Sequence, residues 1–187
     1  MNLAITCESD FWNENTINEI ADECVRNVFN EFKLNPDEED IEICFLFTTD
    51  DEIQLINRTY RGIDKATNVL SFPAFAPDDI PLGKESSCHC HEHCECEDDH
   101  CECDTECECE CCDDEPCVLG SIAVAYETTA REAEEQGKTF GDHLRHLIIH
   151  SLLHLLGYDH IDSEEAKRME DKEIKILKKM GISDPYQ

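Results

Sequence analysis

Residues 84–117 contain no Val, Leu, Ile, Met or aromatic residue. Such a stretch cannot bury enough apolar surface to offset the entropy of ordering its backbone, so we expect it to be disordered in the absence of a ligand. The hydrophobic core must therefore form from the residues on either side. The length suits one domain over residues 1–187 with 84–117 as an insertion, and a core of ~150 residues needs no disulfides.

The insertion is rich in metal-binding side chains. It holds 11 of the 14 cysteines, many in Cys-x-Cys pairs with histidines between them. Thiolates and imidazoles are suitable ligands for Zn(II) or Cu(I), and the composition is similar to that of metallothionein. We predict additional Zn(II) or Cu(I) here, with ligation supplying the energy of folding. An acidic loop with incidental cysteines is the alternative.

The flanking sequence predicts helices packed on a sheet. Apolar residues recur with helical spacing over 17–32, and 41–48 is β-branched, aromatic and apolar at nearly every position, which indicates a strand buried on both faces. Further strands are expected at 2–6, 68–72 and 118–125, and further helices at 50–60, 126–136, 140–156 and 162–180. This order indicates an α/β (α+β) fold with a single mixed β-sheet, although it does not give the strand order.

The formal net charge of −30 disfavours long-range attraction to nucleic acid or anionic membranes, but it does not exclude a small basic site. The first residues lack a signal-peptide pattern, and no segment has the ~20 apolar residues of a membrane helix. We therefore expect a cytoplasmic protein that binds no membrane. Clustered cysteines in a reducing compartment favour metal binding over disulfides.

The predicted helix over 140–156 carries a potential metal site. His150 and His154 are four residues apart and lie on one helix face, where two imidazoles can bind one ion at ~2.0–2.1 Å. Gly157 can end the helix and turn the chain back, which would bring His160 toward the first two rings. Three imidazoles would then leave a fourth ligand position for water.

Two alternatives concern this block. His146 is eight residues from His154, roughly 12 Å along the axis, so we expect it to support the site and not to bind the ion. The spacing HxxxHxxGxxH also occurs in metzincin proteases, which carry a Glu beside the first His as general base. Here that position is Ser151, so a metalloprotease would lack its proton acceptor.

Three blocks together resemble the YbeY-type endoribonucleases, the bacterial rRNA maturation factors. They are residues 57–73 (NRTYRGIDKATNVLSFP), 119–122 (LGSI) and 150–160 (HSLLHLLGYDH). With the order of elements, the resemblance covers about 150 residues, all but the insertion.

The resemblance implies a single-strand-specific, metal-dependent endoribonuclease for 16S rRNA 3′-end maturation and ribosome quality control. It implies one zinc ion on His150, His154 and His160, and Arg61 as a catalytic residue in the same cleft. Its partners would be single-stranded RNA such as pre-16S rRNA and the small ribosomal subunit or its proteins, and not DNA. Asn68 and Ser121 stand where Asp is usual in the family, in two strands expected near the cleft.

The residues allow a matching chemistry. A guanidinium such as that of Arg61 fits two phosphate oxygens, and a metal polarises a phosphoryl oxygen or supplies hydroxide. Arg58, Lys65 and the lysines of the last helix are either further phosphate contacts or solvated charges. The competing hypothesis is a metal-buffering or metal-delivery protein that uses the Cys/His-rich insertion on a catalytically weakened scaffold.

Overall fold

The β-branched and aromatic runs of the sequence pair into one sheet. The computed structural model describes residues 1–37, 41–82, 117–160 and 162–186. Within them, the strands are β1 (Asn2–Cys7), β2 (Ile41–Thr48), β3 (Val69–Pro73) and β4 (Cys117–Ala125). The order is β1-β2-β4-β3, in which β1, β2 and β4 are parallel and β3 is an antiparallel edge strand. The predicted mixed sheet is confirmed, and the structure supplies its strand order.

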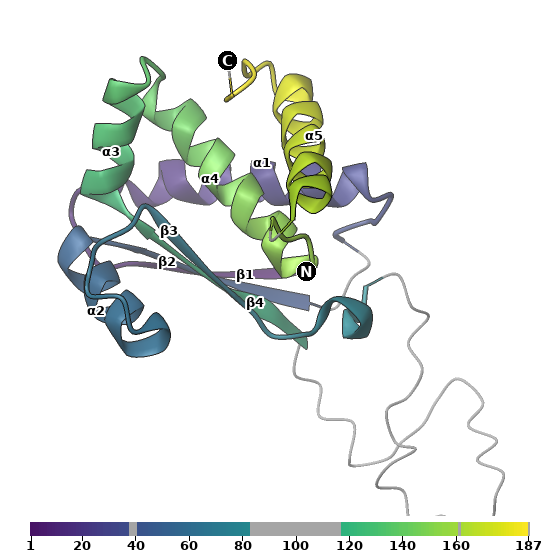
Figure 1. Ribbon diagram of the computed structural model, residues 1–187, viewed down its shortest axis with the longest axis horizontal. Coiled ribbons are helices and arrows are strands. Elements are labelled where there is room, and N and C mark those ends of the chain that lie inside the picture. Colours follow the sequence, from purple (N-terminus) through teal and green to yellow (C-terminus); the bar gives the residue numbers. More distant parts are fainter. Residues whose placement is uncertain (38–40, 83–116, 161, 187) are drawn as a thin grey trace, which may run out of the picture.

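Helices cover the two faces of the sheet unequally. They are α1 (Glu14–Glu31), α2 (Asp50–Arg61), α3 (Tyr126–Glu135), α4 (Phe140–Leu155) and α5 (Ser163–Lys179), with a short 3-10 turn η1 (Pro77–Asp79) in the segment predicted as a loop. α1, α4 and α5 lie on one side of the sheet, whereas α2 lies on the other (Figure 1). The Thr49 and Asp162 side chains cap α2 and α5 by accepting hydrogen bonds from backbone N–H groups of the first turn.

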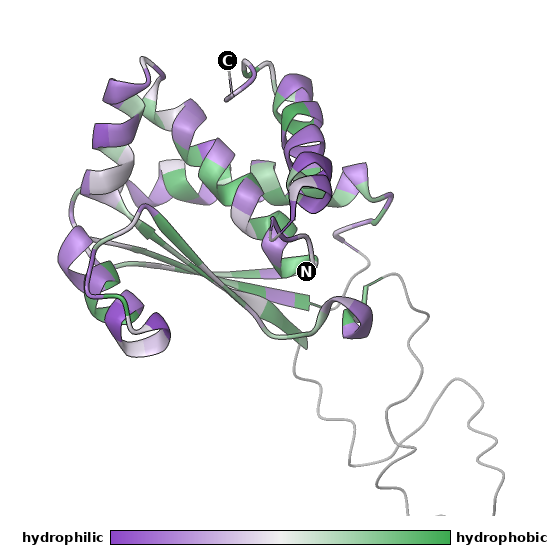
Figure 2. Cartoon of the chain, in the orientation of Figure 1, coloured by the Kyte–Doolittle hydropathy of each residue, from purple (hydrophilic) through white to green (hydrophobic). Residues whose placement is uncertain are grey.

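The hydrophobic core lies between the sheet and the larger group of helices. The predicted stripe on α1 is buried from Ile17 to Phe29, while Phe32 follows the helix and is only partly buried. This stripe packs with the apolar side of α4, including Ile148 and Leu152, and with alternate residues of β2. Figure 2 shows hydrophobic segments along the strands and along α1 and α4, the elements whose buried residues form this core. The core therefore holds α4, the histidine-bearing helix, firmly on the sheet.

The prediction that residues 41–48 are buried on both faces is wrong for one face. Ile41, Ile43, Phe45 and Phe47 are buried, but the residues between them are only half-buried. Side chains alternate between the faces of a strand, and α2 covers only part of the second face. The apolar side chains on that face instead line a groove.

Charged residues join α1 to α5. The carboxylate of Glu31 accepts hydrogen bonds from Lys172, Lys175 and Lys179 at 3.1, 2.6 and 2.8 Å. The Glu31 side chain is only 3% exposed. Three of the lysines on the last helix are thus partners of Glu31, and because their side chains are 32–60% exposed, they also belong to the solvated face that the sequence allowed.

The predicted insertion follows η1 and precedes β4. Apart from Lys84 to Pro116, which lie outside the described residues, only its last residue, Cys117, belongs to the described chain, as the first residue of β4. The single domain over 1–187 stays a prediction. Cys7, Cys24, Cys44 and Cys117 form no disulfide within the described part of the chain. No helix there is long and apolar enough to cross a bilayer.

Candidate metal centre

The end of α4 turns the chain back as the sequence predicts. Gly157 has a φ of 80°, in the left-handed region that a side chain disfavours. The Tyr158 N–H donates to the carbonyl of Leu153, five residues earlier, at 3.0 Å, which is the 6→1 hydrogen bond of a Schellman motif. The return leads directly to His160.

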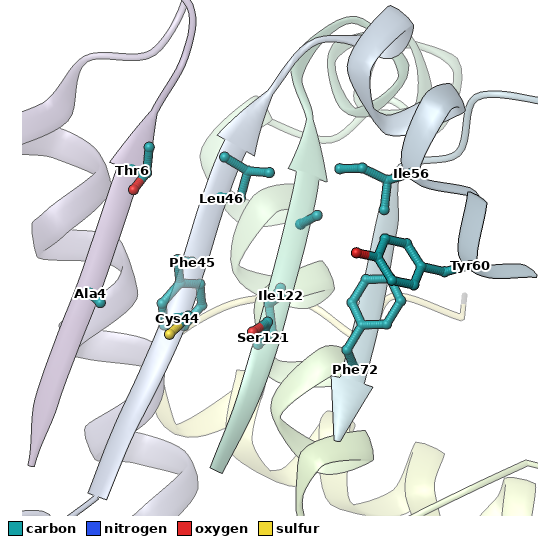
Figure 3. A pocket seen from close by; sticks show the side chains of 11 residues that line it. Ala4, Thr6, Cys44, Phe45, Leu46, Ile56, Tyr60, Phe72, Ser121 and Ile122 are labelled. Carbon is teal, nitrogen blue, oxygen red and sulfur yellow. The ribbon is translucent and has the colours of Figure 1, made fainter. Parts of the chain in front are cut away.

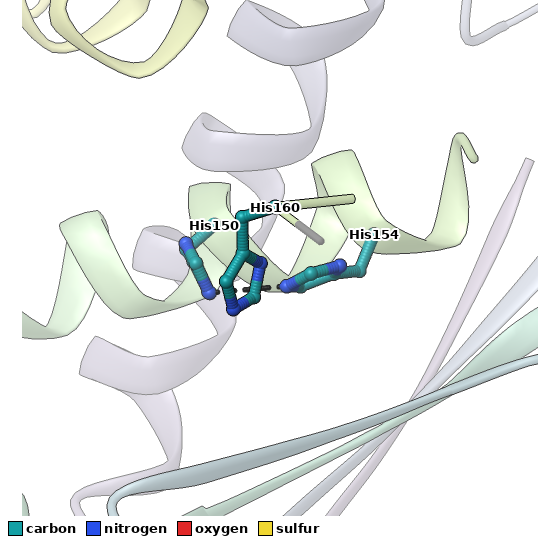
Figure 4. A group of neighbouring side chains, drawn as sticks. All are labelled: His150, His154 and His160. Carbon is teal, nitrogen blue, oxygen red and sulfur yellow. Dashed lines mark hydrogen bonds between the residues drawn. The ribbon is translucent and has the colours of Figure 1, made fainter. Parts of the chain in front are cut away.

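His150, His154 and His160 form one group. A ring nitrogen from each lies within 4.8 Å of those of the other two. His150 and His154 project side by side from α4, and His160 from the returning segment closes over them (Figure 4). The structure therefore brings together the three predicted ligands and leaves His146 outside the group, as expected.

Hydrogen bonds fix the tautomers of the two helical rings. Nδ1 of His154 lies 2.9 Å from the carbonyl oxygen of Tyr158, which can only accept, so Nδ1 carries the hydrogen. Nδ1 of His150 lies 2.7 Å from Oε1 of Glu173 and donates to this carboxylate. In the neutral rings each Nε2 atom then carries a lone pair and no hydrogen. Burial and the nearby His150 lower the pKa of His154, which favours the neutral ring.

The two bare nitrogens fit a metal ion. His150 Nε2 and His154 Nε2 lie only 3.1 Å apart. Two lone pairs at this distance repel each other unless a cation lies between them. Nitrogens that bind one zinc ion at ~2.0–2.1 Å with tetrahedral angles are ~3.3 Å apart. The donor set therefore fits zinc, and the group can bind a metal.

The histidines open into a cavity at the β3 edge of the sheet. The cavity has a volume of about 510 Å³. Its lining consists of Arg61, Asn68, Val69, Ser71, Pro73, His150, His154, Asp159 and His160. Arg61 is the last residue of α2, and alternate side chains of β3 contribute the wall. All four predicted site residues thus line one cavity, whereas Arg58 is 3.9 Å from Asp64 and is not part of the wall.

Asn68 and Ser121 have different surroundings. Asn68 lies in the wall, and its Nδ2 donates to Oε2 of Glu132 at 2.9 Å. Ser121 lies on the opposite face of the sheet, in an apolar groove beside Cys44 and Phe72 (Figure 3). The expectation that both positions lie near the cleft is therefore wrong for Ser121, because its place in β4 directs it to the α2 side.

Ser151 is fully buried on α4 and does not line the cavity. Its hydroxyl has no hydrogen-bond partner in the described part of the chain. It therefore cannot replace the glutamate base of a metzincin, which removes the structural support for a metalloprotease.

The sequence analysis missed Glu173. This side chain is fully buried on α5 and faces α4. Burial acts to raise its pKa, but hydrogen bonds from His146, His150 and Tyr186 outweigh this and lower the pKa to about 2. The available signal was its spacing, because Glu173 occupies the same apolar stripe as Met169, Ile176 and Leu177.

Comparison with known proteins agrees with this geometry. A protein-family model described as endoribonuclease YbeY matches residues 4–181. The chain belongs to the YbeY endoribonuclease family. The family name denotes RNA-cleaving hydrolases, and the resemblance inferred from the three sequence blocks is confirmed.

Individual relatives support this assignment. An endoribonuclease YbeY from Rhodopseudomonas palustris strain BisB18 is 42% identical over 151 residues, which cover 80% of this chain and 71% of the relative. For the protein from strain CGA009 the identity is 42% over 145 residues, covering 78% of this chain but only 60% of the relative. The protein from Bartonella henselae is 37% identical over 187 residues, with 98% and 96% covered.

A solved structure shares the fold. The solution structure of a Thermotoga maritima protein superposes with a TM-score of 0.56 and 22% identity, covering 94% of this chain and 87% of that chain. At this identity the likeness establishes the α+β fold alone.

Proposed function

We propose that this chain is a zinc-dependent endoribonuclease that cleaves single-stranded RNA, with the 3′ end of pre-16S rRNA as substrate and ribosome quality control as its wider role. The observation that carries the proposal is the convergence of the three histidines and Arg61 on one cavity. Family membership supports RNA as the substrate.

His150, His154 and His160 would hold the ion through their ring nitrogens. Zinc bound there would polarise a phosphoryl oxygen and acidify a water molecule toward a pKa of ~7. The Nδ1 atoms of His150 and His154 are engaged by Glu173 and by the carbonyl of Tyr158, which leaves Nε2 of each ring to bind the ion. These two bonds orient the rings before substrate binds.

Arg61 would bind the scissile phosphate. Its planar guanidinium can donate to two phosphate oxygens at once and stabilise the charge that develops on them. A cavity of about 510 Å³ is of small-molecule size, so it has room for a short part of one RNA strand at a time. This favours single-stranded over duplex RNA.

The acidic surface shapes the choice of partner. With a net charge of −30, the protein gains no long-range attraction to free RNA. We therefore propose that it meets its substrate in the cytoplasm on the small ribosomal subunit, with a ribosomal protein contributing to the contact.

Cleavage of a single-stranded RNA with the 3′ sequence of pre-16S rRNA tests the proposal. The zinc-loaded protein should cleave it, and His150→Ala and Arg61→Ala should remove the activity, while Arg58→Ala, outside the cavity wall, should retain it. Absence of cleavage by folded, zinc-loaded protein on free RNA and on ribosome-bound precursor would contradict the proposal.

The alternative of metal buffering or delivery rests on the insertion and stays a prediction. Deletion of residues 85–117 separates the two hypotheses. Retained folding and RNA cleavage would make the insertion an accessory, whereas loss of zinc from the three histidines at limiting zinc would favour a delivery role for the insertion.

A further inference from the structure

Glu173 connects two histidines of α4 to the segment that follows α5. Its Oε1 accepts a hydrogen bond from Nδ1 of His150 at 2.7 Å. Its Oε2 accepts from Nε2 of His146 at 3.2 Å and from the hydroxyl of Tyr186. Within the described residues these three donors engage both oxygens, and none of them is a lysine or arginine.

This arrangement is costly unless a cation is nearby. The Glu173 side chain is 0% exposed, and a buried carboxylate without a cationic partner loses hydration that neutral donors replace only in part. An ion bound to the other nitrogen of His150 would supply a compensating charge one imidazole ring away from Glu173. A carboxylate, an imidazole and a metal in series form a recurrent arrangement in which the carboxylate orients the ligand and raises its basicity.

We propose that Glu173 is a positioning residue for the metal centre, which holds His150 with its hydrogen on Nδ1 and its lone pair directed at the ion, and that Tyr186 holds Glu173 in turn. This inference rests on the proposed function, because it assumes the ion on the three histidines. It adds two residues, from α5 and from the segment after it, to a site otherwise built from α4 and its return.

The contacts of Tyr186 explain how that segment reaches the site. Its ring packs edge-on against His146, with centroids 5.7 Å apart. The neighbouring carbonyl of Pro185 accepts a hydrogen bond from Nζ of Lys138 at 2.9 Å. The segment is thus fixed at Pro185 and at the ring of Tyr186, and the Tyr186 hydroxyl is held toward Oε2 of Glu173.

The Glu173→Gln variant tests the proposal with little change in volume. An amide offers one acceptor oxygen and one NH₂ group. In one orientation the NH₂ group faces the N–H of His150, and in the other it faces the donors of His146 and Tyr186, so one set of hydrogen bonds is always lost. The matched control is Asp171→Asn, an exposed carboxylate-to-amide change on the same helix. Tyr186→Phe is the milder variant, because it removes only the hydroxyl.

The full-length protein is labelled with ¹⁵N-histidine, and the ring nitrogens are followed by NMR during titration with zinc in a chelator buffer. This reads the three-histidine site separately from ions bound elsewhere, and it does not depend on RNA cleavage. We expect Glu173→Gln to lose the fixed Nδ1–H tautomer of His150 and to weaken zinc binding by about 10–100-fold. Tyr186→Phe should weaken it by about fivefold, and Asp171→Asn should match the wild type.

Wild-type tautomer and affinity in a folded Glu173→Gln protein would overturn the proposal. If Glu173→Gln does not fold, Tyr186→Phe becomes the deciding variant. An unchanged zinc affinity of Tyr186→Phe would then overturn the proposal. If the wild-type nitrogens do not respond to zinc at all, the proposed metal-dependent function fails together with the inference.

Discussion

Nε2 of His150 and Nε2 of His154 face each other at 3.1 Å with no hydrogen between them in the neutral rings. The structure enforces this approach, because Glu173 and the carbonyl of Tyr158 each engage the opposite nitrogen of one ring. Two facing lone pairs make the apo site electrostatically unfavourable. Binding of a cation should therefore stabilise the fold as well as enable chemistry.

The first prediction is that zinc raises the melting temperature through these histidines. At a free zinc concentration 100 times the dissociation constant the gain is ~2.7 kcal/mol, or roughly 5–10 °C for a domain of this size. His160→Ala should abolish the gain while leaving metal-free stability nearly unchanged, because the His160 side chain is 57% exposed. Calorimetry with zinc and with chelator checks this. The insertion is intact in both proteins, so an equal gain in the variant would refute the assignment.

How much of this site the sequence could predict depends on the range of the contacts. The approach of His150, His154 and His160 is local, since helical spacing and one glycine turn determine it, and it was predicted correctly. Glu173 reaches His150 only because α5 packs against α4, and nothing in the spacing of the two segments encodes that register. The same holds for Ser121, whose face is decided by the pairing of β4 between β2 and β3.

The fold shows the same division. Each helix and strand was predictable from its own periodicity and caps, to within a few residues at the ends. The strand order and the open face of the sheet were not, because the order depends on pairing between strands far apart in the sequence and the open face depends on where α2 packs. The alternate positions of β2 that are only half-buried show this for the open face. An apolar run such as residues 41–48 is compatible with a strand covered on one face or on two.

The second prediction concerns Gly157, where the chain turns back. A Cβ atom at this position would lie 2.8 Å from Cβ of Pro77, and φ is +80°. Gly157→Ala should therefore lower the free energy of unfolding by about 2–4 kcal/mol, combining left-handed strain with overpacking. It should also weaken zinc binding, because the displaced return carries His160. Urea unfolding and zinc titration measure the two effects.

Gly181→Ala provides the control for backbone strain alone. Gly181 has a similar φ of +77°, but a Cβ there meets nothing within 4 Å. Its cost should be about 1 kcal/mol, with zinc binding unchanged. Equal costs for the two variants would show that the contact with Pro77 contributes nothing.

The third prediction concerns the pH dependence of the link between α1 and α5. Burial acts to raise the pKa of Glu31, but hydrogen bonds from Lys175, Lys179 and Lys172 outweigh it and lower the pKa to about 2. A depressed carboxyl pKa contributes stability that is complete above the unfolded-state value of ~4.5 and is lost as the pH falls toward 2. Glu31→Gln should cost about 1–2 kcal/mol at pH 7, since the lysines are partly exposed and screened.

Urea unfolding of wild type and Glu31→Gln between pH 7 and pH 2 checks this. The difference between them should be constant down to about pH 4.5 and shrink below it. Glu19→Gln, an exposed change on the same helix, should have little effect at any pH. A difference that persists unchanged at pH 2 would mean that packing of the side chain, and not its charge, stabilises the contact.

The fourth prediction separates charge from geometry at Arg61. Lysine keeps the positive charge but presents a single ammonium, so it cannot donate in parallel to two phosphate oxygens. Arg61→Lys should lower kcat/KM for single-stranded RNA by about tenfold or more, up to the ~10²–10³-fold seen when a transition-state donor is removed outright. Zinc binding should not change, because Arg61 belongs to α2 and is not one of the three histidines that would hold the ion. Arg58→Lys, three residues earlier and outside the wall, is the matched control. If Arg61→Lys cleaves RNA as fast as the wild type, two-point phosphate recognition by Arg61 is wrong and its charge alone is sufficient.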